Sequence, residues 1–131
     1  MHFNLLNDQL KLLTGSVIGE YTGELISHEE LEYRWQQYKK LKISNYFFTT
    51  ASNMTIDGGP MGNHTRFINH SCEENCSKVD FVRDKIARVL IKADEGIGEG
   101  EEILINYGQN YFQGMKCLCD QDGCFENRKK F

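Results

Sequence analysis

Residues 62–76 read Gly-Asn-His-Thr-Arg-Phe-Ile-Asn-His-Ser-Cys-Glu-Glu-Asn-Cys and are the most informative stretch of this chain. They pack histidine, arginine, asparagine and cysteine side chains around a short apolar pair, Phe67 and Ile68. Few structural requirements explain these residue types at such density, so the stretch indicates a chemical site. The candidate residues are His64, Arg66, Asn69, His70, Cys72 and Cys76.

Three more thiols follow at tight spacing, from Cys117, Cys119 and Cys124. This spacing is typical of part of a metal site that lacks one ligand, and Cys72 or Cys76 would supply the fourth. The chain has five cysteines, an odd count, and disulfides are the weaker interpretation in a reducing compartment. The sequence therefore predicts a metal site.

Length and composition predict one globular domain, since the chain has 131 residues, 40% hydrophobic and 26% charged. It contains no run of about 18 apolar residues that would span a bilayer. Residues 1–13 carry Asp8 and Lys11, where a secretory signal needs an unbroken apolar segment. We therefore expect an intracellular protein without a membrane partner.

The formal net charge of -4 argues against a nucleic-acid partner, because binding through phosphate contacts needs a basic surface. A basic partner fits better, since acidic groups attract a lysine-rich peptide over a long range. Mild acidity is also common among soluble proteins, so the charge favours a basic partner without identifying one.

Several short segments rich in β-branched and aromatic residues predict strands. They cover residues 17–26, 46–50, 54–56, 79–82, 86–92 and 103–107. Gly19 and Gly23 suggest close backbone approach or a break in pairing within the first segment. A hairpin turn is predicted at residues 83–84 and a second turn at residues 57–60. The predicted fold class is therefore mostly β with short helices.

One longer helix is predicted over about residues 28–41. Ser27 is its expected N-cap, and Glu30 completes a capping box. Acidic residues come early and basic residues late, as the helix dipole favours. Trp35 and Tyr38 fall at helical spacing, and we expect them to pack on the helix face rather than to bind a ligand.

Taken together and in order, these motifs resemble a SET domain followed by a cysteine-rich post-SET segment, as in protein lysine methyltransferases. The resemblance spans about residues 15–127. Each element alone is weak, but a co-linear set with this spacing rarely arises by accident. The elements are Gly19–Glu24, Tyr46–Phe48, Ile56–Asp57, Gly62–Cys72, Glu101–Gly108 and the cysteines at 117, 119 and 124.

This resemblance implies a β-clip-like fold of small sheets, in which the segments around Asn69 and Tyr107 meet in a pseudoknot. It also implies that S-adenosylmethionine binds on one face, while a substrate lysine enters from the opposite face through a narrow channel. Asn69 and His70 match cofactor-contacting positions. Tyr107 matches a catalytic tyrosine beside the transferred methyl group, and Tyr46 matches a tyrosine that lines the lysine channel.

The residue chemistry agrees with these roles. A lysine amine has an unperturbed pKa of about 10.4, so presenting its lone pair at neutral pH costs roughly 4 to 5 kcal/mol. Desolvation and a nearby sulfonium cation both lower that pKa. Tyrosine hydroxyls orient the amine, and their ring faces accept a methylammonium by cation–π attraction. Taken alone, Tyr107 and Tyr46 would instead be packed strand aromatics, and their context favours the catalytic roles.

Ile105 matches a lysine-channel position where this family often has phenylalanine or tyrosine. Isoleucine has no hydroxyl to restrain the amine, so we expect a capacity for more than one methylation. We interpret His28 and His64 as surface or packing residues and Arg66 as structural.

By the same resemblance, one structural zinc ion is held by four thiolates, which leave no open coordination position. The implied ligands are Cys72, Cys117, Cys119 and Cys124. Cys76 is the alternative fourth ligand. The predicted organisation is a SET domain over residues 1–113, with a divergent or shortened first strand, and a post-SET zinc-binding segment over residues 114–131.

The chain also departs from the family pattern. Residues 3–5 stand where a Gly-x-Gly strand normally approaches the cofactor, Glu74 replaces a proline, and Asn106 replaces an aspartate. Side chains at the glycine positions would block close backbone approach. The alternative functions are therefore a catalytically impaired module that binds a basic peptide and a zinc-stapled scaffold.

The segment after the central motif, residues 75–79, resembles the trithorax-type branch, whose substrate is a histone H3 tail lysine. The predicted partner is accordingly a basic protein tail, and the predicted location, inferred from that substrate class, is the nucleus and chromatin. The sequence does not specify the modified lysine, the degree of methylation or the oligomeric state.

Overall fold

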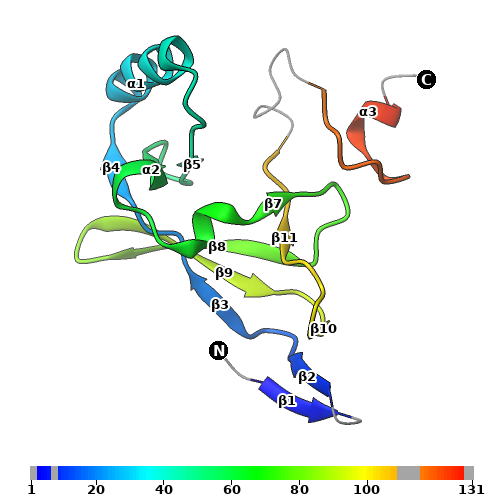
Figure 1. Ribbon diagram of the computed structural model, residues 1–131. Coiled ribbons are helices and arrows are strands. Elements are labelled where there is room, and N and C mark those ends of the chain that lie inside the picture. Colours follow the sequence, from blue (N-terminus) through cyan, green and yellow to red (C-terminus); the bar gives the residue numbers. More distant parts are fainter. Residues whose placement is uncertain (1–2, 7–8, 109–115, 129–131) are drawn as a thin grey trace. The chain divides into compact units, whose positions relative to one another are not determined.

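The computed structural model describes residues 3–6, 9–108 and 116–128 (Figure 1). Short strands and a few helices make up this part of the chain, so the prediction of a mostly β fold is confirmed. Within the described ranges, no helix is long and apolar enough to cross a membrane.

Most strands have only two to four residues, and β8 and β9 reach eight. In the described part of the chain the strands are β1 (Phe3–Leu6), β2 (Gln9–Leu12), β3 (Val17–Glu20), β4 (Glu24–Ile26), β5 (Phe47–Thr49), β6 (Thr55–Asp57), β7 (Asn69–His70), β8 (Cys76–Arg83), β9 (Ile86–Ala93), β10 (Ile97–Gly98) and β11 (Leu104–Ile105). The predicted hairpin is β8–β9. Its turn, at Asp84 and Lys85, lies one residue later than predicted, because Arg83 still belongs to β8; the φ angles of 51° and 65° suit a tight hairpin connection.

The helical elements are α1 (His28–Leu41), α2 (Gly58–Met61), α3 (Phe125–Arg128) and the 3₁₀ helix η1 (His64–Phe67). Helix α1 has the predicted bounds, and the Ser27 hydroxyl accepts a hydrogen bond from the Glu30 amide at 3.2 Å. Such caps satisfy amides that have no partner within the helix. Trp35 and Tyr38 stack on Phe47 with ring centroids 6.2 and 5.5 Å apart, which confirms their packing role.

The strands form four small sheets. Three have three strands, in the orders β1-β2-β10, β3-β9-β8 and β4-β6-β5, and the fourth pairs β7 with β11. The break expected in residues 17–26 falls between β3 and β4. Gly23 lies there so close to β6 that an added Cβ would come within 2.3 Å of the Asp57 carbonyl oxygen. Only glycine fits this approach.

Two parts of the sequence interpretation need correction. Residues 57–60 are not a simple turn, because Asp57 ends β6 and caps α2, with its carboxylate accepting from the Gly59 amide at 2.9 Å. The N-terminal segment, for which no strand pairing was predicted, forms the antiparallel hairpin β1–β2. Both features depend on capping or pairing partners outside the segment itself.

The chain forms two compact units, each assembled from separate segments. The first unit comprises the described residues of 1–18, 68–78 and 92–131, and the second comprises residues 19–67 and 79–91. Buried apolar side chains fill both units. They include Leu12, Ile97 and Ile105 in the first unit and Ile26, Ile56, Val89 and Ile91 in the second. The predicted boundary between residues 113 and 114 lies outside the described residues.

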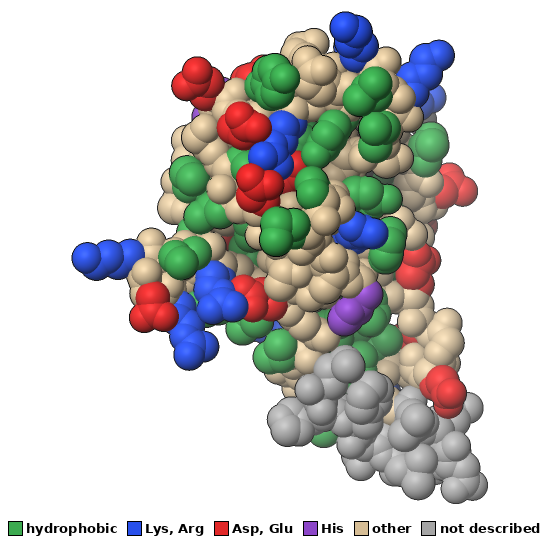
Figure 2. Space-filling model, turned by 60° about the vertical axis from the view of Figure 1, so that its left-hand side comes forward, with side chains coloured by type: hydrophobic (Ala, Val, Ile, Leu, Met, Phe, Trp, Pro, Cys, Tyr) green, Lys and Arg blue, Asp and Glu red, His purple; other side chains and the backbone are tan. Residues whose placement is uncertain are grey.

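Charge is spread rather than concentrated on the surface face drawn in Figure 2. Acidic and basic side chains both occur across the coloured part of that face, with apolar side chains between them. The net charge of -4 therefore does not give this face one sign.

Candidate functional site

In the first unit, the central polar stretch meets the late segment through parallel pairing of β7 with β11 (Figure 1). Asn69 lies opposite Leu104, and His70 lies opposite Ile105. The Ser71 amide extends the pairing by donating to the Ile105 carbonyl at 3.0 Å. Two motifs that are distant in sequence thus lie side by side, as the pseudoknot prediction requires.

The buried side chain of Asn75 holds this pairing. Its amide nitrogen donates to the Glu102 carbonyl at 2.8 Å, and its amide oxygen accepts from the Leu104 amide at 2.9 Å. One side chain thereby satisfies two backbone groups at the start of β11, the Glu102 carbonyl and the Leu104 amide. This role of Asn75 was not predicted from the sequence, because its partners Glu102 and Leu104 lie far along the chain.

Tyr107 lies two residues beyond β11 and contacts His70. Its backbone amide donates to His70 Nδ1 at 2.9 Å, and the two ring centroids are 5.2 Å apart. The Tyr107 hydroxyl donates to the Ile68 carbonyl. The tyrosine predicted to be catalytic is therefore held at both its backbone and its hydroxyl. Ile105, the predicted channel residue, is buried in β11.

Asn69 and His70 differ in exposure. The Asn69 side chain is exposed, and its amide nitrogen donates to Glu102 Oε1 at 2.7 Å. His70 is partly buried, and burial lowers the pKa of its imidazole, while the nearby Glu74 carboxylate acts in the opposite direction. A lowered pKa favours the neutral ring at physiological pH.

The cysteines predicted as metal ligands lie together in the first unit. Cys72 Sγ is 3.9 Å from Cys117 Sγ and 3.6 Å from Cys124 Sγ. The ligand atoms of His70, Cys72, Cys117 and Cys119 all lie within 4.8 Å of one another. These separations are compatible with atoms that converge on one metal ion, so this chain offers five candidate ligands for a single site.

The remaining cysteine and two other histidines stand apart from this group. Cys76 is fully buried in β8 and is not a member of the cluster found among the described residues. His28 and His64 are exposed. The surface position expected for these histidines is thus confirmed.

The thiol environments within the cluster are unequal. Burial raises the pKa of Cys72 to about 12. Burial also acts to raise the pKa of Cys119, but hydrogen bonds from the Cys72 and Gln121 amides and from neighbouring thiols outweigh it and bring the pKa to about 7. Without a cation, thiols this close together cannot all be deprotonated, because their thiolates repel one another. A bound metal ion stabilises the thiolates and allows several of them to be deprotonated together.

Tyr46 lies in the second unit, where its backbone and ring are both fixed. Its carbonyl accepts from the Tyr21 hydroxyl at 2.7 Å and from the Gly58 amide at 2.9 Å. Phe67 meets the Tyr46 ring edge-on with centroids 5.9 Å apart, and the Arg66 guanidinium lies 5.3 Å from the Tyr46 centroid. Arg66 also donates to the Gly58 and Gly59 carbonyls. These contacts give it a structural role, as expected.

Comparison with known proteins agrees with this arrangement. Residues 11–108 match the family model described as the SET domain. The chain belongs to the SET domain family.

Relatives of this SET domain are named as histone-lysine methyltransferases. Histone-lysine N-methyltransferase ash1 of Drosophila melanogaster is 31% identical over 119 residues, covering 88% of this chain and 5% of that protein. The human histone-lysine N-methyltransferase named H3 lysine-36 specific is 32% identical over 115 residues, covering 87% and 4%. An Aspergillus fumigatus enzyme named H3 lysine-4 specific is 35% identical over 113 residues, covering 82% and 9%. The chain thus spans less than a tenth of the length of these relatives.

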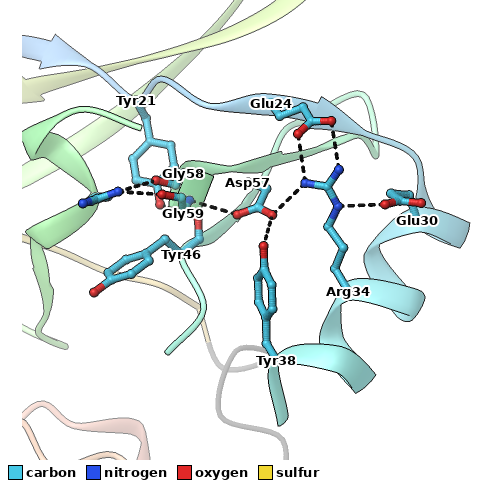
Figure 3. Close-up of polar contacts among 10 residues, drawn as sticks. Tyr21, Glu24, Glu30, Arg34, Tyr38, Tyr46, Asp57, Gly58 and Gly59 are labelled. Atoms are coloured by element: carbon cyan, nitrogen blue, oxygen red, sulfur yellow. Dashed lines mark hydrogen bonds and ion pairs between the residues drawn. The ribbon is translucent and has the colours of Figure 1, made fainter. Parts of the chain in front are cut away.

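Within the second unit of this SET domain, the buried carboxylate of Asp57 organises a polar network (Figure 3). Asp57 Oδ2 accepts from Arg34 at 2.9 Å and from the Tyr38 hydroxyl at 2.8 Å, while Oδ1 caps α2 at Gly59. Burial and the hydrogen bond to Asp57 raise the pKa of Tyr38. The neutral phenol therefore remains a donor.

Arg34 carries the same network to the surface. It pairs with Glu24 and Glu30 at 2.8 Å as well as with Asp57, and these hydrogen bonds raise its pKa (Figure 3). This network was not predicted from the sequence. One local feature could have indicated the cap: Asp57 directly precedes Gly58-Gly59, where an acidic N-cap is favoured. Its pairing with Arg34 of α1 depends on the tertiary fold.

We expect Asp57→Asn to lower the free energy of unfolding by about 2 to 4 kcal/mol, because it leaves the Arg34 charge without its buried partner. Urea denaturation followed by circular dichroism measures this change. Glu30→Gln removes a half-exposed partner of the same arginine and is the matched control, with an expected loss below about 1 kcal/mol. Equal losses in the two variants would contradict a central role for Asp57.

Glu24 predicts an acid-dependent contribution to stability. The hydrogen bond from Arg34 lowers the pKa of Glu24 from its ordinary value of 4.5. A carboxylate with a lowered folded pKa stabilises the protein above its unfolded pKa, and this contribution disappears as pH falls through the folded pKa. The stability difference between the wild type and Glu24→Gln should therefore be constant at neutral pH and shrink below about pH 4.5.

Urea denaturation at a series of pH values from neutral to acid measures this difference. Glu99→Gln, in an exposed loop outside the network, controls for the loss of a surface carboxylate. A difference for Glu24→Gln that stays the same at every pH would argue against a stabilising pair with Arg34.

Proposed function

We propose that this SET domain transfers methyl groups from S-adenosylmethionine to a lysine side chain of a protein. The observation that carries the proposal is the β7–β11 pairing, which brings Asn69 and His70 beside the segment that ends in Tyr107. Membership of the SET family and the names of the relatives support the same chemistry.

The residues present fit a cofactor that carries a sulfonium and an α-ammonium group. Asn69 is exposed and uses its amide nitrogen on Glu102, which leaves its amide oxygen to accept a hydrogen bond from an ammonium. The Glu102 carboxylate adds a negative charge next to that position. When bound, S-adenosylmethionine supplies the methyl group from its sulfonium.

His70 contributes to this site in a more limited way than the sequence suggested. Its Nδ1 faces the Tyr107 amide and its Nε2 faces Cys72 Sγ at 3.4 Å. The cofactor contact proposed for His70 therefore falls to groups other than its ring nitrogens.

In the proposed reaction, the tyrosines position the substrate amine. The Tyr107 hydroxyl donates its proton to the Ile68 carbonyl, and in the proposed reaction its oxygen accepts a hydrogen bond from the amine. Tyr46 lines the lysine channel, with its ring held by Phe67 and Arg66. Ile105 offers no hydroxyl, which favours more than one methylation. The lysine proton leaves to water before its nitrogen attacks in line, and positioning supplies most of the acceleration.

The proposed substrate is a basic protein tail, and the histone H3 tail is the first candidate. The names of two relatives include histone H3, but with different lysines, 36 and 4. We therefore propose the histone H3 tail as the substrate without specifying which of its lysines is methylated. A nuclear, chromatin-associated location follows from that substrate.

We also propose that Cys72, Cys117, Cys119 and Cys124 hold one structural zinc ion. The short distances from Cys72 to Cys117 and Cys124 and the grouping with Cys119 support this ligand set. Four thiolates complete a tetrahedron and leave no catalytic position open.

The methylation proposal predicts that the zinc-loaded chain methylates histone H3 with S-adenosylmethionine. We expect Tyr107→Phe to reduce the rate by about 10²-fold, because it removes one preorganised hydrogen-bonding group at the reacting centre. Mass spectrometry of histone H3 measures the methylated product. Tyr33→Phe is the matched control, since Tyr33 is 60% exposed on α1, and its rate should equal that of the wild type.

Calorimetric titration with S-adenosylmethionine separates the alternatives. Cofactor uptake without methylation would favour an impaired module that binds a basic peptide. No detectable uptake by zinc-loaded protein would reject the enzyme. Equal rates for the wild type and Tyr107→Phe would remove Tyr107 from the mechanism.

The zinc proposal predicts one zinc ion per chain in native mass spectrometry. Cys119→Ala and Cys124→Ala should each lose the metal, because a structural site needs all four ligands. Cys76→Ala should retain it, since Cys76 is buried outside the cluster. A metal-free spectrum for the wild type, or unchanged zinc content in Cys124→Ala, would contradict the proposed ligand set.

A further inference from the structure

We propose that His70 is a positioning residue that couples the zinc site to Tyr107, with one ring nitrogen directed at each. This inference rests on the zinc site and the Tyr107 role of the proposed function. It assigns the His70 side chain a task other than the cofactor contact expected from the sequence. It concerns only residues of the first unit.

The hydrogen bond from Tyr107 fixes the tautomer of the ring. A backbone amide can only donate, so His70 Nδ1, 2.9 Å from the Tyr107 nitrogen, must be the acceptor and carries no proton. The single proton of the neutral imidazole is then on Nε2. That nitrogen lies 3.4 Å from Cys72 Sγ, so it donates an N–H···S hydrogen bond.

This tautomer also decides whether His70 or Cys124 completes a metal site with Cys72, Cys117 and Cys119. His70 lies within reach of the cluster, but a protonated Nε2 has no lone pair for a metal ion. Cys124, with its sulfur 3.6 Å from that of Cys72, has a thiol that becomes a ligand when deprotonated. The geometry therefore makes Cys124 a ligand and leaves His70 as a hydrogen-bond donor to the ligand Cys72.

The two hydrogen bonds of His70 reinforce one another. A metal keeps Cys72 as a thiolate, which accepts a hydrogen bond more strongly than a neutral thiol. The stronger bond holds the ring in the orientation that receives the Tyr107 amide. Metal binding thereby helps to hold Tyr107 in place. Removing a residue that orients a metal ligand through a hydrogen bond typically weakens metal binding by about 10- to 100-fold.

Two substitutions separate the two bonds. His70→Asn keeps an acceptor near the position of Nδ1 and removes the donor to Cys72, whereas His70→Gln keeps a donor near the position of Nε2 and removes the acceptor for Tyr107. We expect His70→Asn to weaken zinc binding by about 10- to 100-fold in a chelator competition. His70→Gln should bind zinc nearly as the wild type does.

Two spectroscopic measurements complete the test. Cobalt(II) replaces zinc, and its thiolate charge-transfer and ligand-field bands should be the same in the wild type and both variants, because His70 is not a ligand. In nitrogen-labelled protein, the Tyr107 amide resonance should shift and exchange faster with solvent in His70→Gln. Removal of zinc from the wild type should move the same resonance in the same direction.

Unchanged zinc affinity in His70→Asn would overturn the inference, and so would cobalt bands that indicate a lost nitrogen ligand. These outcomes are independent of methylation. If both His70 effects are observed while the wild type methylates no histone, the coupling stands and the proposed activity fails. If the wild type methylates histone H3 and the Tyr107 amide resonance is unchanged in both His70 variants, the proposed activity stands and the coupling fails.

Discussion

The parallel pairing of β7 with β11 is the contact from which the candidate site is built. Each strand has only two residues, so the pairing is supported from outside the ladder, by the Ser71 amide on Ile105 and by the buried side chain of Asn75. Closing a long loop for so few backbone bonds is entropically costly. Asn75 offsets that cost, because its one buried side chain bonds the backbone of both Glu102 and Leu104. These two bonds fix the register of β11 against β7 and so the position of Tyr107.

Asp57 plays a comparable part in the second unit. A buried carboxylate is costly unless its oxygens are hydrogen-bonded and its charge is paired, and here the Arg34 guanidinium, the Tyr38 hydroxyl and the Gly59 amide meet both conditions. The result links α1, β6 and α2. Because the Gly58 amide at the start of α2 binds the Tyr46 carbonyl, the same network also fixes the backbone of the proposed channel tyrosine.

The features that the sequence predicted well are those specified by neighbouring residues. Helix α1 follows from a cap at Ser27 and a local charge gradient, and the β8–β9 hairpin follows from two β-rich runs around a short turn. The β1–β2 hairpin, the α2 cap at Asp57 and the clamp at Asn75 were missed, because each depends on a partner that periodicity does not identify. For the site, family motifs indicated which segments meet, but the two-sided role of His70 required atomic positions.

The cysteine cluster provides the buried core of the described part of the C-terminal segment, residues 116–128. Among the described residues there, Cys117, Cys124 and Phe125 are buried together, with Cys72 and Cys119 packed against them. So few apolar side chains cannot compensate for the chain entropy of ordering the segment. A metal held by the four thiolates would supply that free energy, since binding to a site that forms only on folding counts toward stability. Because Cys72 also accepts from His70, ordering the tail and orienting Tyr107 would become parts of one equilibrium.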